Sequence, residues 1–136
     1  MFLNFADIRL NLDFEPGSGS DMPALPGIYA EIHWPTRSLR IGESKNMRTR
    51  NKAHLRWADK HRAGTHLPKE ANRKGPIVDL AKEWGSESLE HYLVSDDPRL
   101  IDRELRVECE KRLHEWARSQ TLYCDLNRQR SYRTIK

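Results

Sequence analysis

Residues 25–54 place the strongest constraint on the fold, because two strand patterns, a turn and a helix start follow one another there. Gly27 opens a run of alternating residues, Pro35–Ser38 is typical of a turn, and Leu39–Gly42 is a second short run. Alternation on both sides of a turn indicates a β-hairpin. The sequence therefore predicts two paired strands followed directly by a helix.

The two faces of this predicted hairpin differ in chemistry. Successive strand residues point to opposite faces. Tyr29, Glu31 and His33 therefore share one face, and the other face is apolar, with Ile28, Ala30, Ile32 and Trp34. In the returning strand Arg40 stands between two apolar residues. Tyr29 and Arg40 are therefore expected on one polar surface.

A polar cap predicts where the helix starts. Ser44 or Asn46 suits the N-cap position, and residues 47–61 contain no Gly or Pro. Arg50 and His54 are four residues apart, so they lie on one face of the helix. The hairpin and the helix together offer tyrosine, arginine and histidine side chains for a single site.

These residues carry a resemblance to a known family. Gly27-Ile28-Tyr29 and Arg40-Ile41-Gly42 resemble the two tripeptides of the GIY-YIG nucleases, with arginine where that family usually has tyrosine. The family has an arginine eight residues after the second tripeptide and often a histidine twelve residues after it, which here are Arg50 and His54. The resemblance implies an α/β (α+β) fold with a small three-stranded mixed or antiparallel sheet flanked by helices.

The resemblance extends over residues 25–127. His61–His66, Ile77–Gly85 and Leu89–Val94 resemble the segment of phage-type members that leads into a third strand. Residues 1–24 are then an N-terminal arm, an extra strand followed by a flexible linker. Residues 128–136 form a basic C-terminal tail.

A second long helix is predicted after the third strand. Ser95–Pro98 is typical of a helix start, and the helix can run to about residue 118. Its apolar stripe, at steps of three and four, consists of Ile101, Leu105, Cys109, Leu113 and Trp116. The family uses a glutamate from this helix to hold a cation, and by resemblance Glu104 or Glu108 takes that role. Glu110 is expected to point away from the stripe.

Basic residues are concentrated in the middle of the chain. Residues 37–75 contain twelve Lys or Arg and three Asp or Glu, a net charge of +9, whereas residues 76–110 contain ten acidic and four basic residues, a net charge of −6. Beside the hairpin, such a block favours a phosphate backbone as partner over an ordinary solvated surface. The candidate nucleic-acid-binding residues are Lys45, Arg48, Lys52, Arg56, Lys60 and His66, with Asn127 added by the resemblance.

By resemblance, the chain is a metal-dependent DNA endonuclease. Tyr29 would take the proton from the attacking water, Arg50 would bind the scissile phosphate, and the helix glutamate would hold one Mg²⁺ or Mn²⁺ near the leaving group. The pKa of free tyrosine is about 10. The two arginines and the cation are expected to lower that of Tyr29 by about two units. His54 would orient water, share the proton or bind a phosphate oxygen.

Arg40 leaves other functions open. A guanidinium cannot act as a base, although it binds phosphate and favours the Tyr29 anion. The alternative is a catalytically inactive nucleic-acid-binding module on the same fold, and a third reading is an interaction protein whose basic face binds an acidic partner. The expected partner is DNA, duplex or branched, with RNA left open, and a homodimer would supply site specificity.

Length and composition set outer limits. The 136 residues, 37% hydrophobic and 32% charged, suit one domain with a thin core. No apolar run reaches the length of a membrane span, and the N-terminus lacks the apolar block of a signal peptide. No membrane partner and a cytoplasmic location are therefore expected. Cys109 and Cys124 lack metal-binding spacing and are expected to be reduced thiols.

Overall fold

The computed structural model describes residues 2–5, 8–17, 19–33, 35, 38–64, 89–119 and 124–125 of the chain. Some sequence predictions lie outside these residues, namely those for Trp34, His66, the segment 77–85, Asn127 and the C-terminal tail 128–136. Within the described ranges, no helix is both long and apolar enough to cross a membrane.

The sheet is built around the predicted hairpin and third strand. β4 (Gly27–His33) pairs antiparallel with β5 (Ser38–Ser44) on one side and with β6 (Leu89–Ser95) on the other. Two short strands extend its edges, β3 (Glu15–Pro16) beside β6 and β7 (Cys124–Asp125) beside β5, which gives the order β3-β6-β4-β5-β7. The predicted α+β fold is confirmed, and the three central strands are antiparallel.

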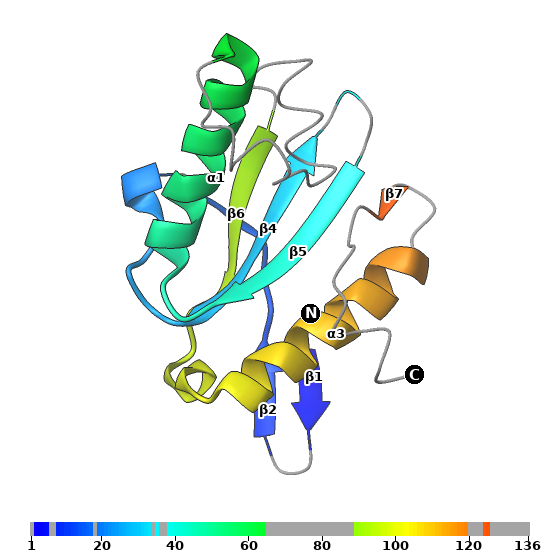
Figure 1. Cartoon of the computed structure of the whole chain (residues 1–136). Helices are drawn as coiled ribbons and strands as arrows, with labels where there is room; N and C mark the ends of the chain where they lie inside the picture. The colour runs from blue at the N-terminus through cyan, green and yellow to red at the C-terminus, as the bar shows by residue number, and fades with distance from the viewer. Residues whose placement is uncertain are drawn as a thin grey trace.

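Within the described residues, two helices flank the sheet, α1 (Met47–Ala63) and α3 (Arg103–Ser119) (Figure 1). Asn46, one of the two predicted caps, starts α1, because its Oδ1 accepts a hydrogen bond from the backbone nitrogen of Thr49 at 3.1 Å. Ser44 instead bonds to the backbone of Asn46 at 3.0 Å. The cap fixes where α1 leaves the end of β5.

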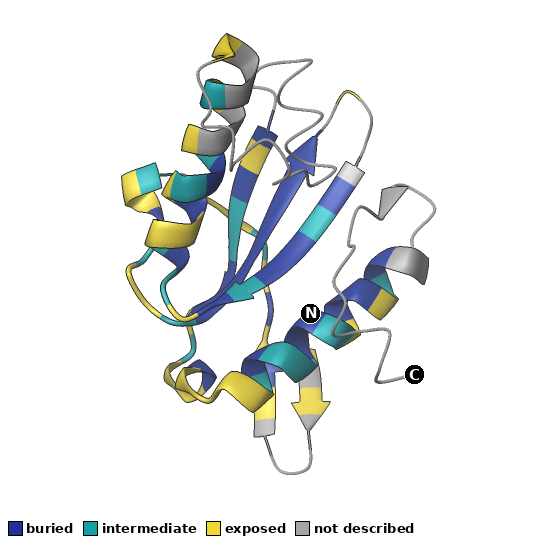
Figure 2. Cartoon of the chain, in the orientation of Figure 1, coloured by how far each residue is buried: buried dark blue, intermediate teal, exposed yellow. Residues whose placement is uncertain are grey.

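The two faces of the sheet are both buried but by different partners. Ile28 on the apolar face packs in one cluster with Cys109 and Leu113 of α3. On the opposite face Tyr29 packs in a second cluster with Met47, the first residue of α1. Every residue of β4 is buried, as the dark blue strand in Figure 2 shows. The polar face of the hairpin is therefore enclosed beneath α1.

The N-terminal arm is part of the same packing unit. β1 (Phe2–Phe5) and β2 (Ile8–Asn11) form a separate two-stranded antiparallel sheet. Leu10 and Leu12, with relative exposures of 0% and 1%, lie in the same cluster as Ile28, which is the main core. The segment predicted as a flexible linker contains β3 and the 3-10 helix η1 (Gly19–Asp21), which packs against α1. The arm therefore helps to position α1 over the sheet.

The predicted helix after residue 97 is divided into η4 (Pro98–Ile101) and α3. Asp97 and Asp102 each accept a hydrogen bond from the backbone nitrogen two residues on, at 2.9 and 3.0 Å, so each begins a new helical segment. The break changes the helical phase, because Leu100 is fully buried while Ile101 is 76% exposed. The prediction that Ile101 belongs to the apolar stripe is therefore wrong. The remaining stripe residues lie in or against the core.

Gly42 stands opposite Tyr29 in the register of β4 and β5. A Cβ atom at Gly42 would lie 2.4 Å from Cζ and Oη of Tyr29, so Gly42→Ala forces the ring to move. We expect the free energy of unfolding to fall by about 1–3 kcal/mol, as for other overpacked sites, in chemical denaturation. Gly17→Ala is the control, because its Cβ would meet only the carbonyl oxygen of Asp21 at 3.9 Å. Equal stability of the two variants would contradict this tight packing.

Candidate functional site

Tyr29, Glu31, Arg40 and His54 meet between the sheet and α1. Glu31 and Arg40 are directly opposed in β4 and β5, and Tyr29 lies two residues before Glu31 on the same face. His54 comes from α1, and the centroids of its ring and the Tyr29 ring are 6.1 Å apart. The structure thus brings together three of the predicted site residues and adds Glu31 to them.

Hydrogen bonds connect the four side chains. Nη1 of Arg40 donates to the hydroxyl oxygen of Tyr29 at 3.1 Å and to Oε1 of Glu31 at 3.0 Å. Nδ1 of His54 lies 2.7 Å from the same Glu31 oxygen. Tyr29 is 1% exposed and Glu31 is 0% exposed, whereas the side chain of Arg40 is 19% exposed. Arg40 is therefore the most accessible of these connected groups.

Glu31 and Arg40 form a charged pair despite their burial. Burial alone would raise the pKa of the Glu31 carboxyl, but His54 and Arg40 outweigh it and lower that pKa to about 2. Burial likewise opposes the charge on Arg40, yet Tyr29 and Glu31 outweigh it and raise the pKa of the guanidinium. Both groups are therefore ionised at neutral pH.

The prediction that the pKa of Tyr29 is lowered is wrong. Burial raises the pKa of Tyr29 above its ordinary value of 10.0, and the negative charge of Glu31 acts in the same direction. Together these effects outweigh Arg40 and Arg50, whose positive charges lower that pKa. Arg50 is exposed on α1, but its charge reaches the phenol and so places it on the same side of the sheet. In the free protein, Tyr29 therefore keeps its proton at neutral pH.

Both glycines of the two tripeptides have a physical role in this arrangement. Gly42 leaves room for the Tyr29 ring, and a Cβ atom at Gly27 would lie 2.3 Å from the carbonyl oxygen of Ser95 in β6.

Searches of family models, curated proteins and solved structures found no match to this chain. The case for a functional site therefore depends on the geometry of the chain itself.

A second set of hydrogen-bonded polar groups lies beside Glu31. His91 of β6 is the cross-strand neighbour of Glu31, and its Nδ1 is 2.5 Å from Nδ2 of Asn51 in α1. The backbone nitrogen of Gly19 donates to Oδ1 of Asn51 at 2.6 Å, which orients the amide. Asn51 therefore donates through Nδ2, and His91 carries its proton on Nε2. Burial lowers the pKa of His91, so its ring is neutral at neutral pH.

The predicted metal ligands do not join this group. Glu104 is exposed at the start of α3, and Glu108 pairs with Arg112 at 3.3 Å. Arg112 also donates to a backbone carbonyl of β1, so this part of α3 faces the N-terminal hairpin. Glu110, expected to point away from the core, is only 2% exposed and lies 3.8 Å from Nε2 of His114.

No three His, Cys, Asp or Glu side chains among the residues with described positions are grouped to hold a metal ion. Glu104 is open to solvent, Glu108 is engaged by an arginine, and Glu110 is enclosed between α3 and β5. The contacts of Glu104 and Glu108 therefore place neither of these predicted ligands beside Tyr29, whereas the negative charge of the buried Glu110 acts on Arg40 and helps to raise its pKa.

The basic residues at and before α1 differ in accessibility. Arg48 is half-buried, and its Nε donates to the carbonyl oxygen of Met22 at 2.9 Å, so it anchors the N-terminal arm to α1. Lys60 is also half-buried. The exposed residues, which we call the α1 basic surface, are Lys45, Arg50, Lys52 and Arg56. Among the described residues, this surface is the part of the predicted nucleic-acid interface that is open to a partner.

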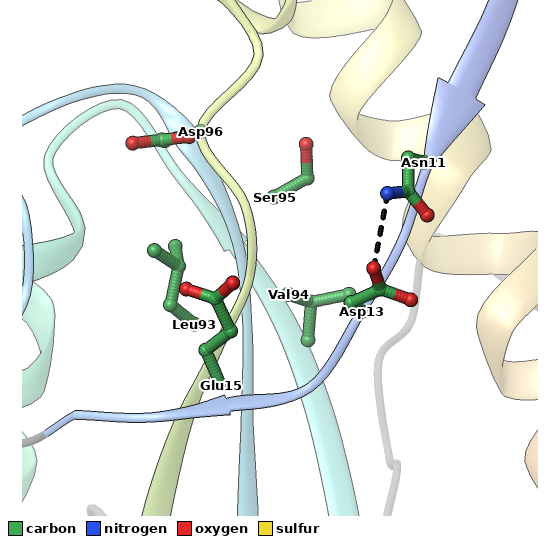
Figure 3. A pocket seen from close by; sticks show the side chains of 7 residues that line it. All are labelled: Asn11, Asp13, Glu15, Leu93, Val94, Ser95 and Asp96. Atoms are coloured by element: carbon green, nitrogen blue, oxygen red, sulfur yellow. Dashed lines mark hydrogen bonds between the residues drawn. The ribbon is translucent and has the colours of Figure 1, made fainter. Parts of the chain in front are cut away.

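A separate pocket of about 170 Å³ lies where the N-terminal arm passes the end of β6 (Figure 3). Asp13, Glu15 and Asp96 contribute carboxylates to its lining. Like charges repel, so this lining disfavours a phosphate group. The pocket is therefore not part of the candidate nucleic-acid site.

Glu31 is the site residue that the sequence reasoning missed. The alternation placed it on the face of Tyr29, and pairing Tyr29 with Gly42 places it opposite Arg40. An acid in the middle of a strand with apolar neighbours is a signal of a buried partner, because an unpaired buried charge is costly. That signal was available in the hairpin alone.

Proposed function

We propose that the chain is an endonuclease that hydrolyses phosphodiester bonds in DNA. The observation that carries the proposal is the 3.1 Å contact between Arg40 and the hydroxyl of Tyr29. A guanidinium beside a phenol is suited both to bind a phosphate oxygen and to favour the phenolate. The α1 basic surface adds the sequence-independent attraction for a nucleic-acid backbone.

In the proposed reaction, the phenolate of Tyr29 takes a proton from water, the water oxygen bonds to phosphorus, and the bond to the 3′ oxygen breaks. The leaving 3′ oxygen takes a proton from solvent water, and Tyr29 returns its proton to solvent before the next turnover. Arg40 and Arg50 neutralise the charge that grows on the phosphoryl oxygens. Because burial raises the pKa of Tyr29, the phenolate is a minor species at neutral pH.

Nicking of supercoiled plasmid DNA tests this proposal. The wild-type chain is incubated with the plasmid in the presence of Mg²⁺, of Mn²⁺ or of a chelator, and the nicked circles are quantified over time. We expect nicking whose rate falls steeply as the salt concentration rises, because bound phosphates release counterions. A chain that binds DNA but leaves the plasmid intact under all three conditions would contradict the endonuclease.

Arg50→Ala is expected to lower the nicking rate by about a hundredfold, the usual effect of losing one donor to transition-state charge. DNA affinity, measured by fluorescence anisotropy, should change much less. Lys52→Ala is the matched variant, because Lys52 is also exposed on α1 but its charge is not among those that shift the pKa of Tyr29. Equal losses of rate in the two variants would count against a specific role for Arg50.

A nucleic-acid-binding module without cleavage is the second candidate. It is favoured by the 1% exposure of Tyr29 and by the effect of burial on the pKa of its hydroxyl, because a protonated phenol is a poor base. In that case DNA binding depends on the α1 basic surface and on salt, and Tyr29→Phe binds as the wild type does. The plasmid assay separates the two functions.

A further inference from the structure

Glu31 lies at the centre of the candidate site, where strand formation alone does not require an acid. It is fully buried in β4, opposite Arg40 on one side and His91 on the other. A buried ion pair loses much hydration, and an apolar pair of similar size is often at least as stable. Packing alone therefore does not account for a carboxylate at this position.

The geometry points to Glu31 as the positioning residue of the site, which holds Arg40 against the hydroxyl of Tyr29 and selects the tautomer of His54. This inference rests on the proposed function, although its structural part is tested separately below. A single oxygen, Oε1, contacts Nη1 of Arg40 at 3.0 Å and Nδ1 of His54 at 2.7 Å. One atom thus fixes two side chains that come from different elements.

The contact with His54 determines where its ring carries the proton. An ionised carboxylate only accepts hydrogen bonds, so Nδ1 of His54 must be the protonated nitrogen, and Nε2 bears the lone pair of the neutral ring. Carboxylates that hold an imidazole in this way set its tautomer in serine hydrolases. Glu31 would therefore leave Nε2, the basic nitrogen of His54, on the side of the ring that faces away from the Glu31 carboxylate.

The contact with Arg40 determines where the guanidinium lies. Its Nη1 is shared between Glu31 at 3.0 Å and the Tyr29 hydroxyl at 3.1 Å, so Glu31 holds the positive charge beside the phenol. Among the described residues, Oε2 of Glu31 has no hydrogen-bond partner. The bonding of this carboxylate is therefore directed to Arg40 and His54, as a positioning role requires.

Nitrogen-15 NMR of the histidine side chains tests the structural part. Spectra are recorded at alkaline pH, where an ordinary imidazole is neutral. In the wild type we expect His54 as the Nδ1–H tautomer. In Glu31→Leu, which removes the acceptor, we expect the Nδ1–H fraction to fall, and in Glu31→Gln, which keeps one acceptor oxygen, we expect it to be retained in part. A wild-type His54 protonated on Nε2 would overturn the inference without any variant.

Nicking kinetics test the functional part. We expect kcat to fall by about ten- to a hundredfold in Glu31→Leu, as for other residues that orient an active group, with little change in KM and partial rescue in Glu31→Gln. Glu115→Gln removes an exposed glutamate from α3 and is the control. An unchanged kcat in a folded Glu31→Leu protein would overturn the role in catalysis. If the wild type does not nick DNA, the proposed function fails while the NMR result still decides the positioning role.

Discussion

The nicking rate is expected to rise about tenfold with each pH unit from neutral pH to above pH 10, as general-base catalysis below the pKa of the base requires. The structure of the site explains why the rate rises with pH. Burial raises the pKa of Tyr29 above 10.0, so the phenolate fraction keeps increasing across this range. Tyr29→Phe should remove the pH dependence and lower the rate by about 10²- to 10⁴-fold. Initial rates of plasmid nicking in a series of buffers at constant ionic strength provide the measurement.

Tyr92→Phe is the matched control for this experiment. Tyr92 also belongs to the central sheet, but it packs against the cluster on the α3 side, away from Arg40 and His54. This variant should keep both the rate and the slope of the wild type. A wild-type rate that levels off near neutral pH would contradict Tyr29 as the general base, because its phenolate fraction is still increasing there.

The central part of the fold was predictable because its signals are local. Alternation on both sides of the turn specified β4 and β5, and the cap at Asn46 specified the start of α1. The period of two also separated the apolar face from the face of Tyr29. Local patterns of this kind depend only on backbone geometry, so they can be interpreted without knowledge of the tertiary structure.

The sequence predictions that the structure contradicts mostly concern interactions between distant segments. A single continuous helix after residue 97 placed Ile101 in the core, but Asp102 starts a new segment and changes the phase. Glu110 was expected to point away from the core, yet α3 packs on β5 in a way that encloses it. The burial of Leu10 likewise depends on the N-terminal arm reaching the main core. The burial of Glu110 and of Leu10 has no period or cap that identifies it, whereas the break that exposes Ile101 is local and is marked by the cap at Asp102.

The candidate site shows the same division. Strand alternation put Tyr29 and Arg40 on one polar surface, and helical phase put Arg50 and His54 on one face of α1. The contact of His54 with Tyr29 also required α1 to cover that face of the sheet, which spacing alone did not specify. The direction of the pKa shift of Tyr29 could not be predicted from the sequence, because desolvation depends on how closely α1 covers the sheet. The charges of Arg40 and Arg50 were counted correctly, but the burial that outweighs them was not visible in the sequence.

Arg40→Met is expected to lower the free energy of unfolding by about 3 kcal/mol at neutral pH, since removing one partner of a buried ion pair leaves the other uncompensated. Glu31 is 0% exposed, and in this variant only His54 would remain as a partner at its Oε1. Urea denaturation monitored by tryptophan fluorescence measures the change. Arg56→Met, at an exposed position of α1, is the control and should stay within about 0.5 kcal/mol of the wild type.

The pH dependence of this difference identifies Glu31 as its source. In the wild type the pKa of Glu31 is about 2 in the folded state and 4.5 when unperturbed. Its contribution, about 3 kcal/mol by linkage, is fully present above pH 4.5 and is lost as the pH falls toward 2. In Arg40→Met one charge that lowers this pKa is absent, so less stability remains to be lost in acid and the two proteins should converge.

The double variant Glu31→Leu/Arg40→Met completes the experiment. Replacing both charges by apolar side chains removes the buried carboxylate that Arg40→Met leaves uncompensated, so most of the lost stability should return. The remaining deficit reports the hydrogen bonds that His54 and the hydroxyl of Tyr29 lose when Glu31 and Arg40 are absent. A double variant no more stable than Arg40→Met would mean that the arginine stabilises the sheet by packing of its side chain rather than by pairing with Glu31.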